Sequence, residues 1–201
     1  MGPSVKRVVS FHAKGTRSVN HFDHVRLIRD GVGAAETGTT DGFAPPVWAD
    51  IGSGDGAFTL ALADLLGEGA TIHSVDRDGR ALREQARKLR TAFPEVVAEF
   101  HVGDFTHALD LPPLDGIVMA NALHFVRNQT ALVAHLRGYL KPGGRFVLVE
   151  YDTDQGNRWV PYPLSFRSWE ALAPACGFAT TRLLATVPSR FLGAIYAALS
   201  R

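Results

Sequence analysis

From Pro46 onward, short apolar runs alternate with segments whose apolar residues recur at helical spacing. Parallel strands need long crossover connections, usually helices, so this alternation predicts βαβ units and a mostly parallel sheet. The expected strands are Val47–Ile51, Ala70–Val75, Val97–Val102, Gly116–Ala122, Arg145–Tyr151, Phe178–Val187 and Phe191–Leu199. The last two are separated only by a short turn, which indicates an antiparallel pair. The chain is therefore predicted to have an α/β fold.

Helical periodicity fills the connections between these strands. The expected helices are Phe58–Leu66, Leu82–Phe93, Leu132–Leu140 and a helix from the N-cap Ser165 to about Ala173. Gly67 and Pro94 are predicted to end the first two helices, and Pro142-Gly-Gly144 the third.

The first 45 residues do not follow this pattern. They mix Gly, Ser, Thr and His around one short amphipathic stretch, residues 21–29. We interpret residues 1–45 as an N-terminal cap or lid segment and residues 46–201 as the ligand-binding domain. A length of 201 residues with 46% hydrophobic residues is enough for one such domain.

A Gly-rich turn, Gly52-Ser-Gly-Asp-Gly56, follows the first strand and opens into a helix. Glycines permit a tight turn and let a ligand approach the backbone closely. Asp76 ends the second strand, 20 residues beyond Gly56, where a carboxylate can accept hydrogen bonds from ribose hydroxyls. Taken singly, the glycines also fit a tight turn that binds no ligand. Asp76 alone also fits a carboxylate that stabilises the N-terminus of the next helix. Their joint occurrence favours a ribose-containing cofactor.

These residues are part of a wider resemblance to the class I S-adenosylmethionine-dependent methyltransferases, in particular the small-molecule, type 11/25-like group. The segments that carry it are Asp50–Gly56, Ser74–Arg77, His101–Phe105, Asp115–His124 and Leu140–Gly144. The resemblance runs from about residue 47 to residue 199. It implies a Rossmann-like, doubly wound sheet of seven strands in the order 3-2-1-4-5-7-6, with strand 7 antiparallel.

The resemblance also implies a set of cofactor contacts. Asp50 would lie near the cofactor's ammonium group, and Asp76 would hold the ribose hydroxyls. Arg77 would lie against the adenine, while Asp104 and the amide of Phe105 would bind its polar edge. The implied cofactor-binding residues are Asp50, Gly52, Gly54, Gly56, Asp76, Arg77, Asp104, Phe105 and Asn121.

The reaction itself puts few demands on side chains, because displacement at a sulfonium methyl is driven largely by positioning. If the acceptor must lose a proton, His124 after the fourth strand is our candidate base, with Glu150 and Tyr151 in reserve. The alternative is that His124 only packs or forms a local hydrogen bond. No metal is predicted, since Asn121 ends the fourth strand without an adjacent Asp.

The predicted function is methyl transfer from S-adenosylmethionine to a small molecule, releasing S-adenosylhomocysteine. An NAD-dependent oxidoreductase is disfavoured by Asp50 and the terminal strand pair, and a non-catalytic cofactor-binding protein of this fold is the other alternative. A net charge of +1 indicates no nucleic-acid partner. No apolar run approaches membrane-spanning length, and one cysteine, Cys176, fits the cytoplasm. The sequence carries no sign of oligomeric state.

Overall fold

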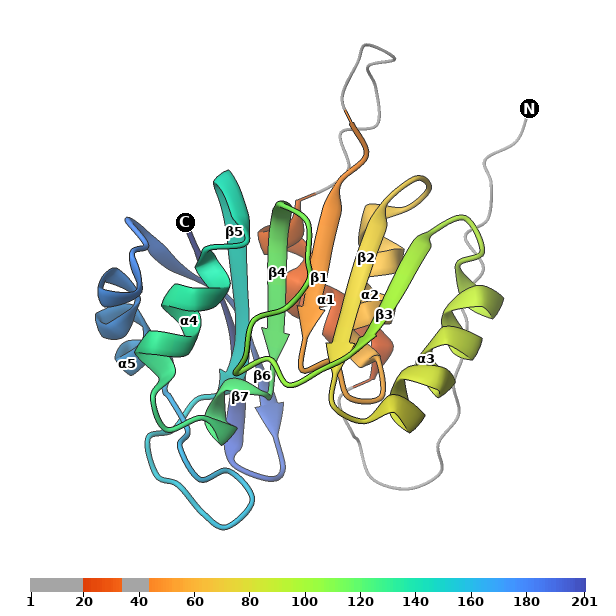
Figure 1. Cartoon of the computed structure of the whole chain (residues 1–201). Helices are drawn as coiled ribbons and strands as arrows, with labels where there is room; N and C mark the ends of the chain where they lie inside the picture. The colour runs from red at the N-terminus through yellow and green to blue at the C-terminus, as the bar shows by residue number, and fades with distance from the viewer. Residues whose placement is uncertain (1–19, 34–43) are drawn as a thin grey trace, which may run out of the picture.

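The computed structural model describes residues 20–33 and 44–201. Its centre is a single seven-stranded sheet in the order β3-β2-β1-β4-β5-β7-β6 (Figure 1). β7 pairs antiparallel with both β5 and β6, and the other pairs are parallel. The strands are β1 Val47–Ile51, β2 Thr71–Asp76, β3 Val97–Val102, β4 Leu114–Ala120, β5 Leu140–Tyr151, β6 Thr181–Ser189 and β7 Gly193–Ser200. The predicted fold class and strand order are confirmed.

Helices cover the sheet on two faces, each with its own apolar core. The first face is covered by α1 His21–Val32, α2 Ala57–Leu66 and α3 Gly79–Ala92. The second face is covered by α4 Gln129–Arg137, α5 Phe166–Leu172 and the short 3-10 helices η1 Leu123–Phe125 and η2 Ala173–Cys176. This double layering is typical of doubly wound α/β domains.

Helix α1 is the described part of the predicted cap segment. It begins with a capping box between Asn20 and Asp23, and its apolar stripe, including Leu27 and Ile28, is buried in the first core. Its last carbonyl groups accept hydrogen bonds from strand arginines, Arg145 among them. Residues 1–19 and 34–43 lie outside the described residues, so the division into cap and domain stays a prediction.

The helix before β5 is shorter than predicted. α4 ends at Arg137, and Leu140, which we expected within the helix, is instead the first residue of β5 and pairs with Leu114. The register then shifts to Gly116 opposite Arg145, so the Pro-Gly-Gly segment lies inside an irregular strand rather than ending a helix. The apolar side chain of Leu140 belongs to a strand. Over so short a run, periodicity alone cannot distinguish the end of a helix from the start of a strand.

The two faces are covered unequally. On the second face, no helix of the described chain lies over β2 and β3, and only the loop 103–113 crosses the sheet beside them (Figure 1). On β3, Val97 and Glu99 of this face are exposed and His101 is partly exposed, while Ala98 and Phe100 pack against the first core. Part of one sheet face is therefore open to solvent.

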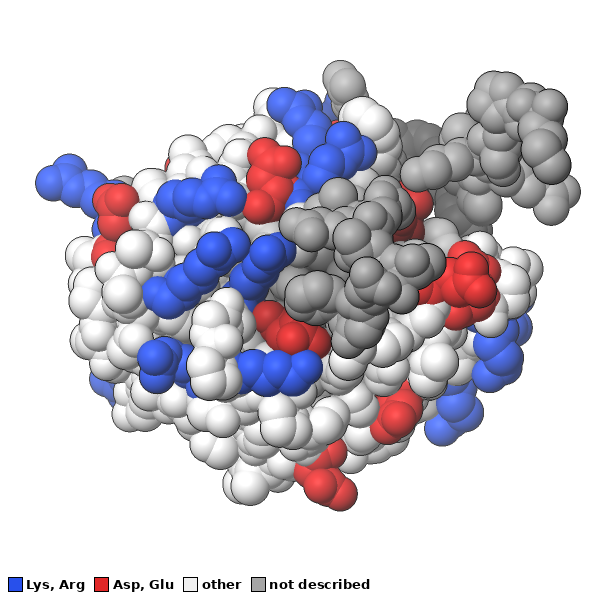
Figure 2. All heavy atoms as spheres, turned by 90° about the horizontal axis from the view of Figure 1, so that it is seen from above, with Lys and Arg blue, Asp and Glu red and all other residues white. Residues whose placement is uncertain are grey.

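Charged side chains collect at the amino ends of the parallel strands. Figure 2 views this end and shows Lys and Arg side chains grouped on one half of it, with acidic side chains among them. Arg182, for example, donates to the carbonyl of Asp30 in the last turn of α1, at 3.0 Å. This end lies opposite the Gly-rich turn. Within the described residues, no helix has the length and apolar character needed to cross a membrane.

Candidate functional site

The Gly-rich turn joins β1 to α2 at the carboxyl end of the sheet. Gly52, Gly54 and Gly56 all have positive φ, at 73°, 55° and 87°, which favours glycine at each position. A Cβ on Gly52 would lie 2.6 Å from Ala122 Cβ, and one on Gly56 would lie 2.5 Å from Gln85 Cγ. A Cβ on Gly54 would meet no atom within 4 Å. Two glycines thus permit close packing, while the third faces open space that a ligand can enter.

A buried amide that we did not predict as functional holds the turn in shape. Gln85 of α3 is 2% exposed, and its Nε2 donates to Gly54 O at 2.6 Å and to Ser53 Oγ at 3.0 Å. Its Oε1 accepts from the hydroxyls of Ser74 and Thr59. The one sequence signal was a polar residue at an inward position of an amphipathic helix, where an amide needs buried partners.

Asp76 ties the turn to the end of β2. Its Oδ2 accepts from the backbone N–H of Gly54, and its Oδ1 accepts from that of Asp78, both at 2.8 Å. A carboxylate offers about four lone-pair sites, so two backbone donors leave room for hydroxyl groups of a ligand. The fold thus brings Asp76 next to the Gly-rich turn, as expected if both bind one ribose-containing cofactor.

Asp50, next to the last residue of β1, is buried with 1% exposure. Its Oδ2 accepts a 2.6 Å hydrogen bond from Thr59 Oγ1. Burial raises the pKa of the Asp50 carboxyl to about 7, although the hydrogen bonds from Thr59 oppose the shift. A cation close to the Asp50 carboxyl would favour its ionised form and so oppose the effect of burial on its pKa.

The residues expected at the adenine form the outer side of the site. Asp104 accepts from the hydroxyl and the amide of Thr106, at 2.7 and 2.9 Å, and these bonds hold its pKa below the usual value. Phe105 lies against the turn, since its ring is 3.1 Å from the point where a Gly52 Cβ would stand. Arg77 is exposed and, within the described chain, its side chain forms no hydrogen bond or ion pair.

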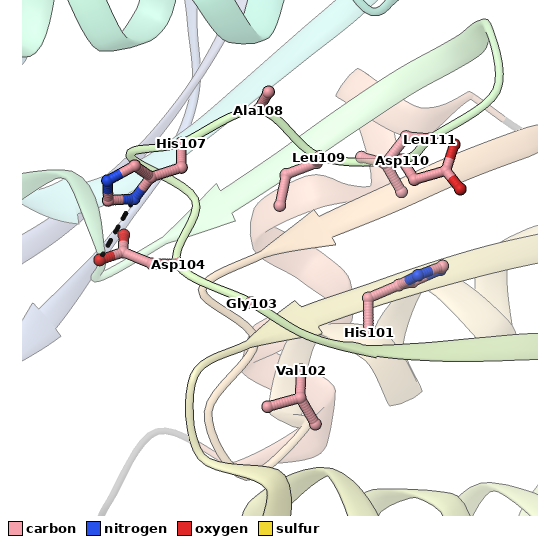
Figure 3. Close-up of a pocket in the computed structure, with 9 residues that line it drawn as sticks. All are labelled: His101, Val102, Gly103, Asp104, His107, Ala108, Leu109, Asp110 and Leu111. Carbon is pink, nitrogen blue, oxygen red and sulfur yellow. Dashed lines mark ion pairs between the residues drawn. The ribbon is translucent and has the colours of Figure 1, made fainter.

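A cavity of about 490 Å³ begins at Asp104. It is lined by residues 101–104 and 107–111, and it runs along β3 and the loop that follows (Figure 3). His107 Nδ1 lies 3.8 Å from Asp104 Oδ2 at its rim. The cavity therefore adjoins the predicted adenine side of the site and does not include His124.

Asn121 follows β4 in a strained conformation. Its φ of 50° is the one positive value among the non-glycine residues that the structure describes. The backbone N–H of Asn121 donates to Val149 O at 2.8 Å. The buried side-chain oxygen Oδ1 has no hydrogen-bond partner within the described chain. An unpaired buried acceptor costs about 1–3 kcal/mol, so this oxygen is suited to a donor from a ligand.

His124 forms a buried pair with Glu150. The histidine lies in η1 after β4 with 3% exposure, and the glutamate lies near the end of β5 with none. His124 Nδ1 is 2.7 Å from Glu150 Oε2, and the His124 amide donates to Oε1 at 3.2 Å. An ionised carboxylate only accepts, so Nδ1 donates to Glu150, and in the neutral ring the lone pair is on Nε2. The pair thus places a carboxylate where it orients the imidazole ring.

The sequence-predicted residues thus fall into two groups around the adjacent carboxyl ends of β1 and β4. The turn, Asp50 and Asp76 belong to the β1 side, and Asn121 and His124 belong to the β4 side. The strand order reverses between β1 and β4, and ligands of such sheets bind at this switch point. Arg77 is exposed at the periphery, where its charge is among those that lower the pKa of Asp104.

A family model for a methyltransferase domain matches residues 49–146. Among curated proteins, the chain is 26% identical over 163 residues to a reducing polyketide synthase, grgA, of Penicillium sp.. That match covers 69% of this chain and 6% of the synthase. The chain spans 6% or less of the length of the three curated relatives that it matches.

Solved structures share the fold. An arsenic(III) S-adenosylmethionine methyltransferase from Chlamydomonas reinhardtii has a TM-score of 0.64 and 14% identity, covering 90% of this chain and 71% of that one. The CurJ carbon methyltransferase has a TM-score of 0.63 and 20% identity, covering 80% of this chain and 50% of that one. At these identities the likeness establishes the architecture, and the chemistry must be argued from the site.

Proposed function

The chain carries a methyltransferase domain, and we propose that it transfers a methyl group from S-adenosylmethionine to a small-molecule acceptor whose proton His124 removes. The observation that carries this proposal is the buried His124–Glu150 pair beside the Gly-rich turn. The turn alone would suit several nucleotide cofactors. A base held next to it gives the site a reaction to perform.

The residues at the switch point fit S-adenosylmethionine. Open space above Gly54 admits a ligand to the backbone, and Asp76 retains acceptor capacity for ribose hydroxyls. Asp50 offers a buried carboxylate to the cofactor's ammonium group, and the unpaired Oδ1 of Asn121 offers an acceptor nearby. The assignments of Arg77, Asp104 and Phe105 to the adenine are retained as part of this proposal.

His124 and Glu150 handle the proton. S-adenosylmethionine, when bound, would supply an electrophilic methyl group: the acceptor would bond to the methyl carbon as the carbon–sulfur bond breaks, and S-adenosylhomocysteine would leave with the electron pair. His124 Nε2 takes the proton that the acceptor loses, and the resulting imidazolium is stabilised by Glu150 at 2.7 Å. Glu150 also fixes the ring through the His124 amide, so the base is oriented before the acceptor arrives.

The names of the relatives favour one class of acceptor. The curated relatives are polyketide synthases, and one structural neighbour is a carbon methyltransferase. A carbon flanked by two carbonyl groups carries a proton that an imidazole can remove, which matches the buried pair. We therefore propose a 3-oxoacyl thioester as the acceptor class. A cytoplasmic location remains a prediction that rests on cysteine usage.

The proposal is tested first by calorimetric titration with S-adenosylhomocysteine and, separately, with NAD. We expect saturable binding of the former only. Wild type is then incubated with S-adenosylmethionine and an acetoacetyl thioester, and methylated product is measured by mass spectrometry. His124→Gln should lower turnover by about 10²–10⁴-fold, because the base is lost, while its affinity for S-adenosylhomocysteine stays within about twofold of wild type.

His135→Gln is the matched control, since His135 is an exposed histidine of α4. It should leave binding and turnover unchanged. Binding of NAD alone would support the oxidoreductase instead. Full turnover in His124→Gln would show that the acceptor loses its proton without this base.

A further inference from the structure

Two histidines and a glutamate meet on the open part of the second sheet face, away from the switch point. His73 of β2 stands directly opposite Glu99 of β3, and His101 follows Glu99 two residues later. Successive strand side chains alternate between faces, so all three project from the same face. No sequence spacing indicates this cluster, because strand pairing alone brings His73 to the other two.

The three ligand atoms are spaced as around a metal ion. His73 Nδ1 lies 3.0 Å from His101 Nε2 and 3.6 Å from Glu99 Oε2, and the latter two atoms are 3.9 Å apart. A point about 2.1 Å from all three atoms satisfies these distances, and this is the bond length of Zn²⁺ to imidazole nitrogen and carboxylate oxygen. The 3.0 Å separation of the two ring nitrogens also fits a hydrogen bond between the rings, so metal titration decides between the two arrangements.

From this geometry we propose that His73, Glu99 and His101 bind one divalent transition-metal ion, for which Zn²⁺ is the probe. Imidazole and carboxylate ligands suit zinc and its neighbours better than Mg²⁺ or Ca²⁺, which prefer all-oxygen sets. Three protein ligands leave at least one coordination position for water.

The surroundings agree with an accessible site. His73 is buried with 3% exposure, the His101 side chain is 29% exposed and that of Glu99 55%, so the cluster extends from the interior to the surface. His101 also lines the 490 Å³ cavity, and Figure 3 shows its ring across from Asp110 and Leu111. An ion can enter and leave from this side.

A bound ion would link β2 and β3, which no helix of the described residues covers on this face. Metal ligands must be deprotonated and positioned, and an ion that binds only the folded chain stabilises it. The expected consequence is structural: the ion holds β2 to β3 near the predicted adenine side of the site. It takes no part in the proton transfer assigned to His124.

The test uses the full chain without an affinity tag, treated with a chelator and dialysed. Calorimetric titration with ZnCl₂ should show one site, and His101→Ala and Glu99→Gln should each weaken binding by more than about tenfold. His107→Ala is the matched control, because this exposed histidine lines the same cavity without belonging to the cluster. It should bind Zn²⁺ like wild type.

Thermal unfolding with and without Zn²⁺ gives a second readout. The ion should raise the Tm of wild type and of His107→Ala but not of the two cluster variants. Equal Zn²⁺ affinity in wild type and His101→Ala would overturn the proposal, as would the absence of saturable binding to folded wild type. Circular dichroism of each variant without metal establishes that it is folded.

Discussion

Asp50 has a carboxyl group whose ionisation depends on the folded state. Its pKa is raised to about 7 by burial, against about 3.9 in an unfolded chain. Between these values the folded protein keeps a proton that the unfolded chain has lost, so the free energy of unfolding falls as pH rises from about 4 to about 7. The contribution is about 1.4 kcal/mol for each pH unit within that range.

Urea denaturation at pH 5 and pH 8 measures this effect. We expect the wild type to lose more stability than Asp50→Asn over this interval, because the amide cannot ionise. Saturating S-adenosylhomocysteine should reduce the loss in wild type if its ammonium group pairs with the Asp50 carboxylate. An identical change with pH in both proteins would mean that Asp50 ionises at an ordinary pH.

The contacts of residues in contiguous motifs could be predicted from the sequence. Contacts between residues that only the tertiary fold brings together could not. The Gly-rich turn and Asp76 come together because strand ends of parallel neighbours meet at one edge. His124 was chosen for its place after the fourth strand, but its contact with Glu150 depends on the relative register of two strands and one helical turn. Sequence spacing carries no such information.

At the scale of elements, α3 supports the Gly-rich turn mainly through one buried side chain, that of Gln85, since Lys88 reaches the Asp55 carbonyl only at 3.5 Å. Replacing Gln85 by Leu removes both donors, so the Gly54 carbonyl loses its hydrogen bond and the Ser53 hydroxyl keeps only the one from Ser74. Each unsatisfied buried group costs about 1–3 kcal/mol, so the turn should shift. Gln85→Leu is expected to weaken S-adenosylhomocysteine binding at least about tenfold in calorimetry.

Glu84→Leu is the control for this variant. Glu84 precedes Gln85 in α3, but its side chain is exposed and pairs with Arg87 on the helix surface. The control should bind S-adenosylhomocysteine like wild type. If Gln85→Leu also binds with wild-type affinity, the turn keeps its shape without the amide.

Helices and strands could be predicted wherever the spacing of apolar residues fitted only one of the two. The βαβ alternation predicted a mostly parallel sheet, the resemblance implied its strand order, and the structure has both. The error at Leu140 arose because one apolar residue continues a helical pattern and equally begins a strand. The role of Gln85 was not predicted, since its partners come from α2, β2 and the Gly-rich turn.

At the scale of the whole molecule, α1 joins the helical layer to the strands at the far edge of the sheet. Gly31 makes this contact possible, because a Cβ there would lie 2.7 Å from Leu184 Cδ1 and 2.8 Å from Val147 Cγ2. Gly31→Val should lower the free energy of unfolding by about 1–3 kcal/mol through overpacking. Urea denaturation followed by circular dichroism and tryptophan fluorescence measures the loss.

Arg26→Val is the matched control, since it places the same side chain at an exposed position of α1. It should change stability much less than Gly31→Val. Coincident transitions for both probes would show that α1 unfolds with the sheet. An unchanged midpoint in Gly31→Val would mean that α1 is not docked on these strands.

The same packing of α1 sets an order of events during synthesis. Arg182 donates to the carbonyl of Asp30, which lies 152 residues earlier in the chain. Helix α1 also packs on strands from the C-terminal part of the chain. Contacts of such high sequence separation slow folding, so docking of α1 comes late. At about 5–20 residues per second, the ribosome needs on the order of ten seconds to make the intervening chain. Throughout that interval the apolar stripe of α1 is without its partner strands and available to chaperones.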